Sequence, residues 1–558
     1  MKYAANSVIL HSMEHSRKPS FIKGAAILAA ASLICKVLGV LFRVFAIRIL
    51  GEEGMFFYEK VYPTYSWLLI ISSSGIPIAI SRMVASRVAR GAFNEAETVF
   101  KRAFWMLFVL GAVTTALMFL GAAPIAGFVL GSSDRGMILS LRALAPALFF
   151  TSILCAYRGY LQGLQRMTGT GLSQLAEQVF KMLFGLSLAF VLHKEYAHSE
   201  MGAAMGSVGI LLGVTISEAL AVAVIYPIYR TERKRLLPVD FRYDPALSER
   251  HILRDLLAIA VPITLGASIL PIANVVDSAM ITRLLVRAGI PDGEANRLYV
   301  ILCTYVRSII NLPAGLSTSL SMAVVPAIAT AMAHTNEKGV RHLSAMSVKL
   351  AMTIGLPCAV GLSVLARPAI FLLYGSILPH SLDVAEGLMR IAAFTVVFIS
   401  LSQTATGALQ GVGKHRLPVY FLLIGGLTKI VVNLVCVSIP SVNIYGAVFS
   451  NLSCYGIAAL LDTIALVVVT KAKLSAFNVF IKPIFASAIM GGFAYVTYRA
   501  FGYLFDLNRY LFSAIACVTA ILVSIVVYLV LILALKVFTR EELALVPGGR
   551  KLVRFFRN

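Results

Sequence analysis

The sequence predicts an all-α polytopic membrane protein of about 14 transmembrane helices, in two pseudo-symmetric six-helix lobes followed by two further helices. Of its 558 residues, 59% are hydrophobic and only 13% are charged, whereas soluble chains carry about 25% charged residues. Apolar segments of roughly 20 residues or more, enough to cross a bilayer, recur along the chain. The first half also resembles the second, which predicts the two lobes.

Fourteen apolar segments follow one another along the chain. They are 22–50, 61–86, 103–130, 137–160, 171–192, 202–229, 255–285, 298–333, 346–373, 386–410, 417–437, 444–470, 482–501 and 510–535. Prolines such as Pro77, Pro262 and Pro313 interrupt several segments, which a membrane tolerates where neighbouring helices or a cavity satisfy the freed backbone groups. The first twenty residues lack the apolar core and cleavage site of a secretory signal, so we expect an uncleaved first helix.

The charges alternate between successive connections. Connections after odd-numbered segments are short and acidic, for example at Asp383 and Glu386, whereas those after even-numbered segments carry cations, for example from Arg233 to Arg235. Because Lys and Arg collect in cytoplasmic loops, both termini are predicted to be cytoplasmic. The net charge of +23 reflects this distribution. No soluble stretch is long enough for a basic nucleic-acid-binding domain, so we expect no nucleic-acid partner.

An internal repeat organises the chain. The stretch from Arg158 to Gly163 ends the fourth segment, and the similar stretch from Thr406 to Gly411 ends the tenth. An even number of helices per copy gives both copies one orientation, with a cavity expected between the lobes. The predicted domains are a cytoplasmic tail (1–21), an N-lobe (22–229), a basic cytoplasmic linker (230–254), a C-lobe (255–470), two last helices (471–535) and a basic cytoplasmic tail (536–558).

Patterns of covalent chemistry are lacking in the sequence. It holds no G-x-S-x-G, H-E-x-x-H or Walker motif, and its seven cysteines lie in apolar segments without a C-x-x-C pair. We therefore expect neither an enzyme nor a protein with a metal or organic cofactor.

Cations inside the apolar segments are the candidate functional residues, because each costs about 2.5–3.5 kcal/mol at a helix centre. Lys36 and Arg43 stand about two helical turns apart and so share one face of the first segment. Together with Arg82 and Arg307, they predict a cationic cavity for phosphate or pyrophosphate, to which arginine donates paired hydrogen bonds. The alternative is that such side chains reach the lipid headgroups, which we favour for Arg48, Arg142 and Arg158.

Acidic residues are fewer in these segments. Asp277 follows two prolines, and it either holds sodium or a proton or pairs with an arginine; both interpretations stay open. For Glu218 and Asp462 we expect ion pairs with Lys181 and Lys429, respectively. The aromatic residues at the start of the second segment are predicted to form an interfacial belt; they are Tyr58, Tyr62, Tyr65 and Trp67.

Several of these stretches resemble a known family. The residues from Lys36 to Arg43, from Arg48 to Gly54, from Gly75 to Arg82, from Tyr157 to Gln165 and from Ala260 to Gly266 resemble the stage V sporulation protein B and polysaccharide-biosynthesis branch of the multidrug/oligosaccharidyl-lipid/polysaccharide exporter superfamily. That branch includes the MurJ-type lipid II flippases. The resemblance covers nearly the whole chain.

The resemblance implies a flippase that moves undecaprenyl-pyrophosphate-linked peptidoglycan precursor across a bacterial plasma membrane by alternating access. Arg43 and Arg82 match basic positions of the family, and Arg307 stands one place from the arginine of MurJ proteins. Asp277 and Asn433 match positions that resemble sodium ligands there, although Val437 replaces the acid expected one turn later. The last two helices would form a groove for the polyprenyl tail.

Three alternatives remain at this point. The cargo could be another lipid-linked polysaccharide unit or a spore cortex precursor. A drug–cation antiporter of the same superfamily is less consistent with the excess of Arg and Lys, and a scaffold for cell-wall synthesis proteins would gain nothing from buried charges. The partners expected are the lipid-linked glycan, membrane lipids and cell-wall synthesis proteins, with sodium or proton coupling.

Overall fold

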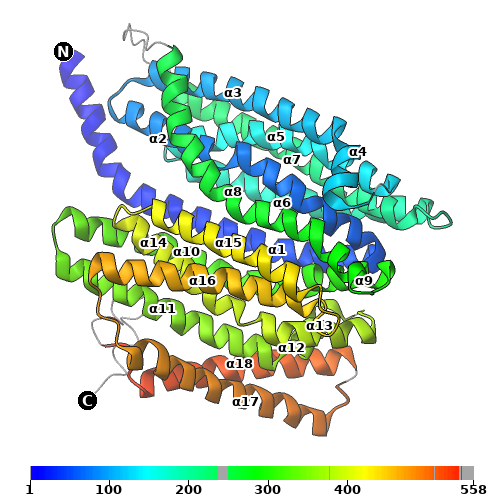
Figure 1. Ribbon diagram of the computed structural model, residues 1–558. Coiled ribbons are helices and arrows are strands. Elements are labelled where there is room, and N and C mark those ends of the chain that lie inside the picture. Colours follow the sequence, from blue (N-terminus) through cyan, green and yellow to red (C-terminus); the bar gives the residue numbers. More distant parts are fainter. Residues whose placement is uncertain are drawn as a thin grey trace. The chain divides into compact units, whose positions relative to one another are not determined.

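The computed structural model describes residues 2–132, 134–236, 249–375, 377–507, 509–539 and 542. These residues form helices and no strand (Figure 1). Eleven of the helices are long and apolar enough to cross a membrane, or twelve if one pair bent by 40° (Pro379–Ala392 and Thr395–Gly411) is a single span. The all-α polytopic fold is thus confirmed. The count of 14 is compatible with these spans, since segments 22–50 and 61–86 would add two.

The chain forms two compact units, Met1–Ala279 and Met280–Asn558. The first contains α1 (Lys2–Ser73), α2 (Gly75–Ala89), α3 (Phe93–Leu120), α4 (Ala122–Pro124), α5 (Arg135–Gly163), α6 (Met167–Glu195), α7 (Gly202–Leu236) and most of α8 (Glu249–Arg287). The lobe boundaries predicted from the sequence stay predictions. Positions 237–248 of the basic linker, 540–541 and 543–558 of the C-terminal tail lie outside the described residues.

The second unit contains the remaining helices. They are α9 (Asp292–Val300), α10 (Ser308–Ala333), α11 (Glu337–Val364), α12 (Ala366–Tyr374), α13 (Pro379–Ala392), α14 (Thr395–Gly411), α15 (Arg416–Cys436), α16 (Tyr445–Thr470), α17 (Lys482–Leu504) and α18 (Tyr510–Ala534). Three π-helical turns, Ile125–Leu130, Ile301–Arg307 and Phe477–Ile481, adjoin α4, α9 and α17.

A break at Gly51 separates the first two predicted segments. Its backbone has φ 64° and ψ −173° within α1, a left-handed conformation that glycine adopts without steric cost. The connection expected between the segments is therefore helical, and Glu59, expected in an external loop, is only 5% exposed. The break brings the second part of α1 back against its first part, which positions the residues described below.

The internal repeat is visible in helix packing. A Cβ at Gly159 would lie 2.9 Å from the carbonyl oxygen of Pro77 on α2, and one at Gly407 would lie 3.0 Å from that of Ser321 on α10. Gly163 and Gly411, one turn later, are equally tight against α2 and α10. Small residues four apart allow such close approach of membrane helices. Each unit thus uses the same contact between equivalent helices.

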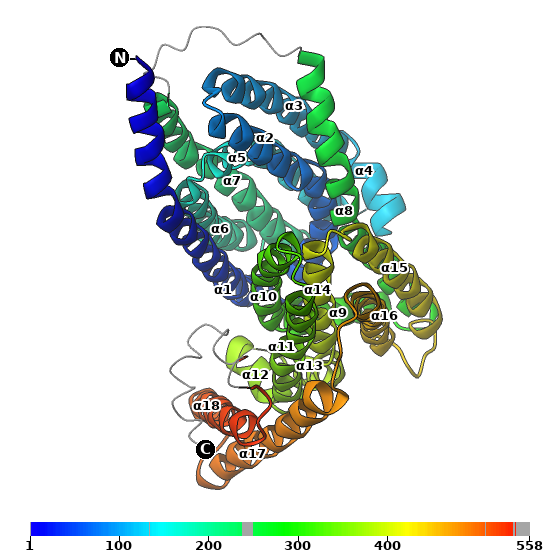
Figure 2. The same ribbon diagram turned by 90° about the vertical axis from the view of Figure 1, so that its left-hand side faces the viewer.

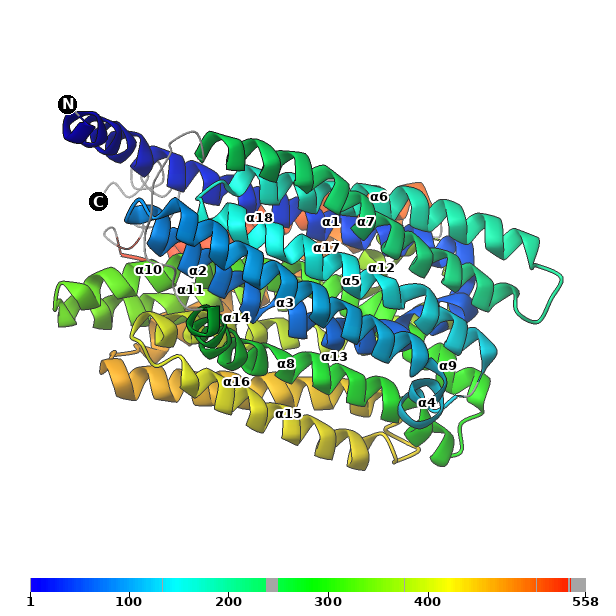
Figure 3. The same cartoon turned by 90° about the horizontal axis from the view of Figure 1, so that it is seen from above.

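Helix hairpins complete each unit. In the first unit, α6 and α7 lie side by side (Figure 3), and a Cβ at Gly213 would meet the backbone of Gly185 at 2.2 Å. In the second, α15 and α16 pair, and so do α17 and α18 (Figure 2). The last pair packs on α11, where Tyr528 donates a hydrogen bond to the carbonyl oxygen of Thr353 at 2.7 Å.

Candidate functional site: cations within the helices

Lys36 and Arg43 lie on one continuous stretch of α1, so the predicted shared face is present. Lys36 is exposed and, within the described residues, makes no hydrogen bond or ion pair. Arg43 is partly buried, with 22% of its side chain exposed. The two cations therefore differ in their surroundings: the Lys36 side chain is exposed, whereas the Arg43 side chain is packed among other residues of the first unit.

Arg43 has an acidic neighbour that the sequence did not reveal. Its Nη1 atom lies 3.6 Å from Oε1 of Glu59. Glu59 follows the break at Gly51, and only the return of α1 brings it beside Arg43. The pair compensates the buried carboxylate, and 22% of the Arg43 side chain stays exposed.

Lys181 of α6 lies within an aromatic cluster. Its ammonium group stands 4.7 Å from the ring centroid of Phe42 and 5.3 Å from that of Tyr62. Tyr62 stacks on Tyr58 at 5.1 Å and contacts Tyr65 at 5.6 Å. Cation–π attraction stabilises the lysine here. The expectation of an interfacial belt is wrong for Tyr58 and Tyr65, which are each 2% exposed.

Arg158 is part of a partly buried ion pair. Its Nη2 donates to Oε2 of Glu177 at 2.9 Å and its Nε to Oγ of Ser173 at 3.0 Å. Only 13% of the side chain is exposed, so the expectation that Arg158 reaches the headgroups is wrong. Glu218, 5% exposed, forms no ion pair with Lys181 among the described residues, and its Oε2 has no hydrogen-bond partner there. The predicted Glu218–Lys181 pair is therefore also wrong.

Arg82 lies on α2, five residues after Pro77. It is exposed, and the described part of the chain offers it no hydrogen bond or ion pair. Arg48 and Arg142 are also exposed, and the Arg142 guanidinium stands 5.7 Å over the Phe119 ring. Arg82 and Lys36 thus differ from Arg158 in having no ionic partner among the described residues.

The second unit holds the remaining predicted residues. Arg307 is partly buried at the end of the π-helical turn before α10. Lys429 and Asn433, one turn apart on α15, are 3% and 0% exposed, and Val437 is buried after them. The predicted Asp462–Lys429 pair is wrong, because Asp462 instead accepts hydrogen bonds from Ser402 and Thr406.

Asp277 is 1% exposed on α8, in the first unit. Lys60 of α1 reaches the same turn, where its Nζ donates to the carbonyl oxygen of Ser278. Lys60 is itself 1% exposed. A buried ammonium therefore supplies positive charge beside Asp277, a feature that the sequence analysis did not find. Lys60 lies one helical turn after Phe56, and its ammonium group stands 5.7 Å from the centroid of that ring; its spacing of two residues from Tyr58 and Tyr62 puts it on a different face from these tyrosines.

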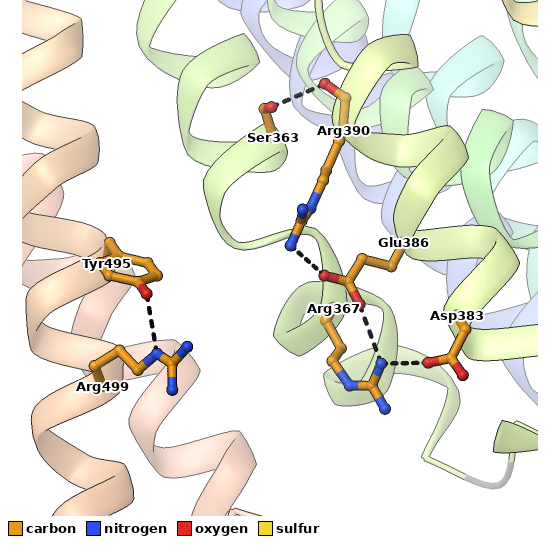
Figure 4. Close-up of polar contacts among 7 residues, drawn as sticks. All are labelled: Ser363, Arg367, Asp383, Glu386, Arg390, Tyr495 and Arg499. Carbon is orange, nitrogen blue, oxygen red and sulfur yellow. Dashed lines mark hydrogen bonds and ion pairs between the residues drawn. The ribbon is translucent and has the colours of Figure 1, made fainter.

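A separate polar cluster lies around α12 and α13 of the second unit (Figure 4). Arg367 bridges Asp383 at 2.5 Å and Glu386 at 3.1 Å, and Arg390 donates to Glu386 at 2.5 Å. On α17, Arg499 donates to the Tyr495 hydroxyl at 3.1 Å. The acids expected on the external side of the membrane thus compensate arginines. Exposed pairs of this kind contribute about 0–1 kcal/mol each.

The chain matches two known protein families. Residues 21–332, more than half of it, match the family "Polysaccharide biosynthesis protein", and residues 303–435 match the MatE family.

Relatives in Bacillus subtilis cover most of the chain. An uncharacterized membrane protein, YabM, is 27% identical over 96% of this chain and 96% of its own length. Lipid II flippase MurJ is 25% identical over 79% of this chain and 81% of its own length, and stage V sporulation protein B is 25% identical over 96% and 100%.

Among solved structures, lipid II flippase MurJ in an inward closed conformation superposes with a TM-score of 0.64, at 15% identity, over 92% of this chain and 99% of that chain. This likeness shows a shared fold. The chain therefore belongs to the polysaccharide biosynthesis protein family, in the branch of the multidrug/oligosaccharidyl-lipid/polysaccharide exporter superfamily that includes stage V sporulation protein B and MurJ.

Proposed function

We propose that the protein is a flippase of the bacterial plasma membrane that moves a lipid-linked glycan by alternating access, with the peptidoglycan precursor lipid II as its cargo. The observation that carries this proposal is the cationic set of the first unit. Lys36 and Arg82 are exposed without partners among the described residues, and Arg43 shares a helix face with Lys36. Such side chains are suited to a pyrophosphate.

Each cation has a distinct role in this proposal. Arg43 binds the pyrophosphate while Glu59, 3.6 Å away, fixes the orientation of the guanidinium. Lys36 and Arg82 add positive charge that attracts the pyrophosphate. Arg307 of the second unit is proposed to add further positive charge. Membrane lipids surround the helices, both termini are cytoplasmic, and cell-wall synthesis proteins are the proposed partners. Asp277 and Asn433 remain the candidates for coupling to sodium or protons.

The test is complementation in cells depleted of their own lipid II flippase, combined with a direct assay of headgroup translocation. We expect Arg43→Ala to abolish growth support and Arg43→Lys to retain part of it, because lysine keeps the charge but not the paired hydrogen bonds. Arg48→Ala is the matched control, since Arg48 is an exposed arginine of the same helix outside the Lys36–Arg43 face. Full translocation by Arg43→Ala at normal protein levels would refute the role of this residue.

A second cargo deserves the same assay. Stage V sporulation protein B matches this chain over its entire length at 25% identity, which supports a spore cortex precursor or another lipid-linked polysaccharide unit. Growth support in flippase-depleted cells favours lipid II. Rescue only of a sporulation-defective strain favours the second cargo.

A further inference from the structure

Asp462 has an unusual environment for a carboxyl group inside a helix bundle. It lies in α16 and is 1% exposed. Its Oδ2 accepts hydrogen bonds from Oγ of Ser402 at 2.8 Å and from Oγ1 of Thr406 at 3.2 Å, one turn apart on α14. Its Oδ1 has no hydrogen-bond partner within the described residues. The carboxyl group is therefore buried with one of its two oxygens lacking a hydrogen bond from the described residues.

Within the described residues, the surrounding helices form no ion pair with Asp462. α11, α13, α14 and α15 pack against α16, and α14 has no charged residue. Among the cations on the others, Lys349 bonds Glu542, Arg390 bonds Glu386 and Arg341 bonds Glu337, whereas Lys338 and Arg416 lie near the starts of α11 and α15. Lys429 of α15 forms no ion pair with Asp462 in the described part of the chain. Two neutral hydroxyls are thus the groups that act on this carboxyl.

The first unit holds an equivalent buried carboxyl, Glu218, which has a cation nearby but likewise has one oxygen without a hydrogen-bond partner among the described residues. In the repeat, Arg158 takes the place of Thr406 and Glu218 that of Asp462. Arg158 bonds Glu177 and exerts its positive charge on Glu218. In the second unit a hydroxyl replaces the guanidinium, and no cation of the described residues pairs with Asp462. An ionised carboxylate in this setting is strongly unfavourable, whereas a proton on it removes the charge.

We propose that Asp462 is a proton-binding site, distinct from Asp277 and Asn433, whose Oδ1 takes a proton from water on one side of the membrane and returns it to the other. Ser402 and Thr406 hold the Oδ2 atom and leave Oδ1 to carry the proton. In the buried setting described here the neutral form is favoured, and release of the proton when the transport cycle brings water to the carboxyl group would make it a coupling group for transport. The coupling to cargo rests on the proposed function, whereas the bound proton does not.

Infrared difference spectroscopy of the purified full-length protein in lipid tests the proton directly. We expect the carbonyl band of a neutral carboxylic acid at pH 7 that is missing from Asp462→Asn and kept in Asp383→Asn, an exposed acid that serves as the control. Ser402→Ala should shift the band, because it removes one hydrogen bond and keeps the acid. An unchanged band in Asp462→Asn would overturn the proposal, and so would loss of the band when sodium replaces choline at constant pH.

Transport assays then test the coupling. We expect the wild type to respond to an imposed pH gradient and Asp462→Asn to lose that response, while Asp383→Asn retains it. An Asp462→Asn variant that still responds would overturn the coupling. If the protein moves no lipid-linked cargo but shows the Asp462 band, the proposed cargo fails and the proton site stands.

Discussion

At the scale of residues, several charges within the first unit are compensated by groups that lie elsewhere in the sequence. Glu59 lies beside Arg43, Glu177 bonds Arg158, and the rings of Phe42 and Tyr62 face Lys181. Removing one member of a buried pair leaves an uncompensated charge, which costs more than removing both. Lys36 and Arg82 lack such partners among the described residues, which separates residues that stabilise the fold from candidates for ligand binding.

The Arg158–Glu177 pair provides a stability test at this scale. We expect Arg158→Met to lower the free energy of unfolding by about 1–3 kcal/mol, because the partly buried Glu177 is left without its cation beside Glu218. The double variant with Glu177→Met should recover most of that loss. Thermal unfolding in detergent measures both. A double variant less stable than Arg158→Met would contradict the interpretation.

At the scale of elements, glycines determine where helices approach. The Gly75 amide donates to Oγ1 of Thr264 at 3.2 Å, and a Cβ added at Gly75 would lie 2.1 Å from the carbonyl oxygen of Ala260. That atom is backbone and cannot rotate away, so α2 and α8 must separate if a side chain is added. The contact joins α8 to the core of the first unit, where Ile252, Leu256 and Ala260 are buried.

Gly75→Ala tests this contact. We expect it to lower the free energy of unfolding by about 1–3 kcal/mol, as overpacking does in well-packed interiors. Gly492→Ala on α17 is the matched control, because nothing lies within 4 Å of a Cβ there. Equal melting temperatures of the two variants would refute the tight approach.

The C-terminal end of the described chain is held by a capping arrangement. The Thr539 amide donates to Oε2 of Glu542 at 2.7 Å, the Glu542 amide donates to Oγ1 of Thr539 at 3.3 Å, and Lys349 of α11 bonds the same carboxylate at 2.7 Å. Burial alone would raise the pKa of Glu542, but the hydrogen bonds from Lys349 and Thr539 outweigh it and lower the pKa. Thr539 and Glu542 thus form a capping box tied to α11.

This pKa predicts a pH dependence. Because the folded-state pKa is lowered, the contact stabilises the protein above the ordinary value of about 4.5 and loses this effect as the pH falls through the lower folded value. We expect Glu542→Gln to destabilise by about 1–3 kcal/mol at pH 7, with the difference from wild type disappearing in acid. Glu337→Gln, in an exposed pair with Arg341, should change little at either pH. A difference that persists in acid would contradict the assignment.

At the scale of the whole molecule, the family and the alternating charges predict an orientation. An epitope inserted near Asp506 should be accessible to antibody on intact cells, whereas one near Lys414 should become accessible only after permeabilisation. Growth support by each insertion confirms that the protein is folded. Labelling of both sites from outside would refute the cytoplasmic termini.

The sequence by itself determined the class of fold, the apolar segments, the internal repeat and the family. These follow from hydrophobicity, residue spacing and loop charge, which are local properties that the bilayer enforces along the whole chain. The shared face of Lys36 and Arg43 was also predictable, because it requires only helical geometry.

Only the tertiary structure decided the partners of the buried charges. The sequence predicts Glu59 in a loop, Arg158 facing the lipid headgroups and Asp462 in an ion pair with Lys429. The return of α1 after Gly51, the contact of α5 with α6 and the packing of α14 on α16 gave them other neighbours. A residue's type fixes the cost of burying its charge, but which group compensates that charge depends on helices brought together from distant parts of the chain.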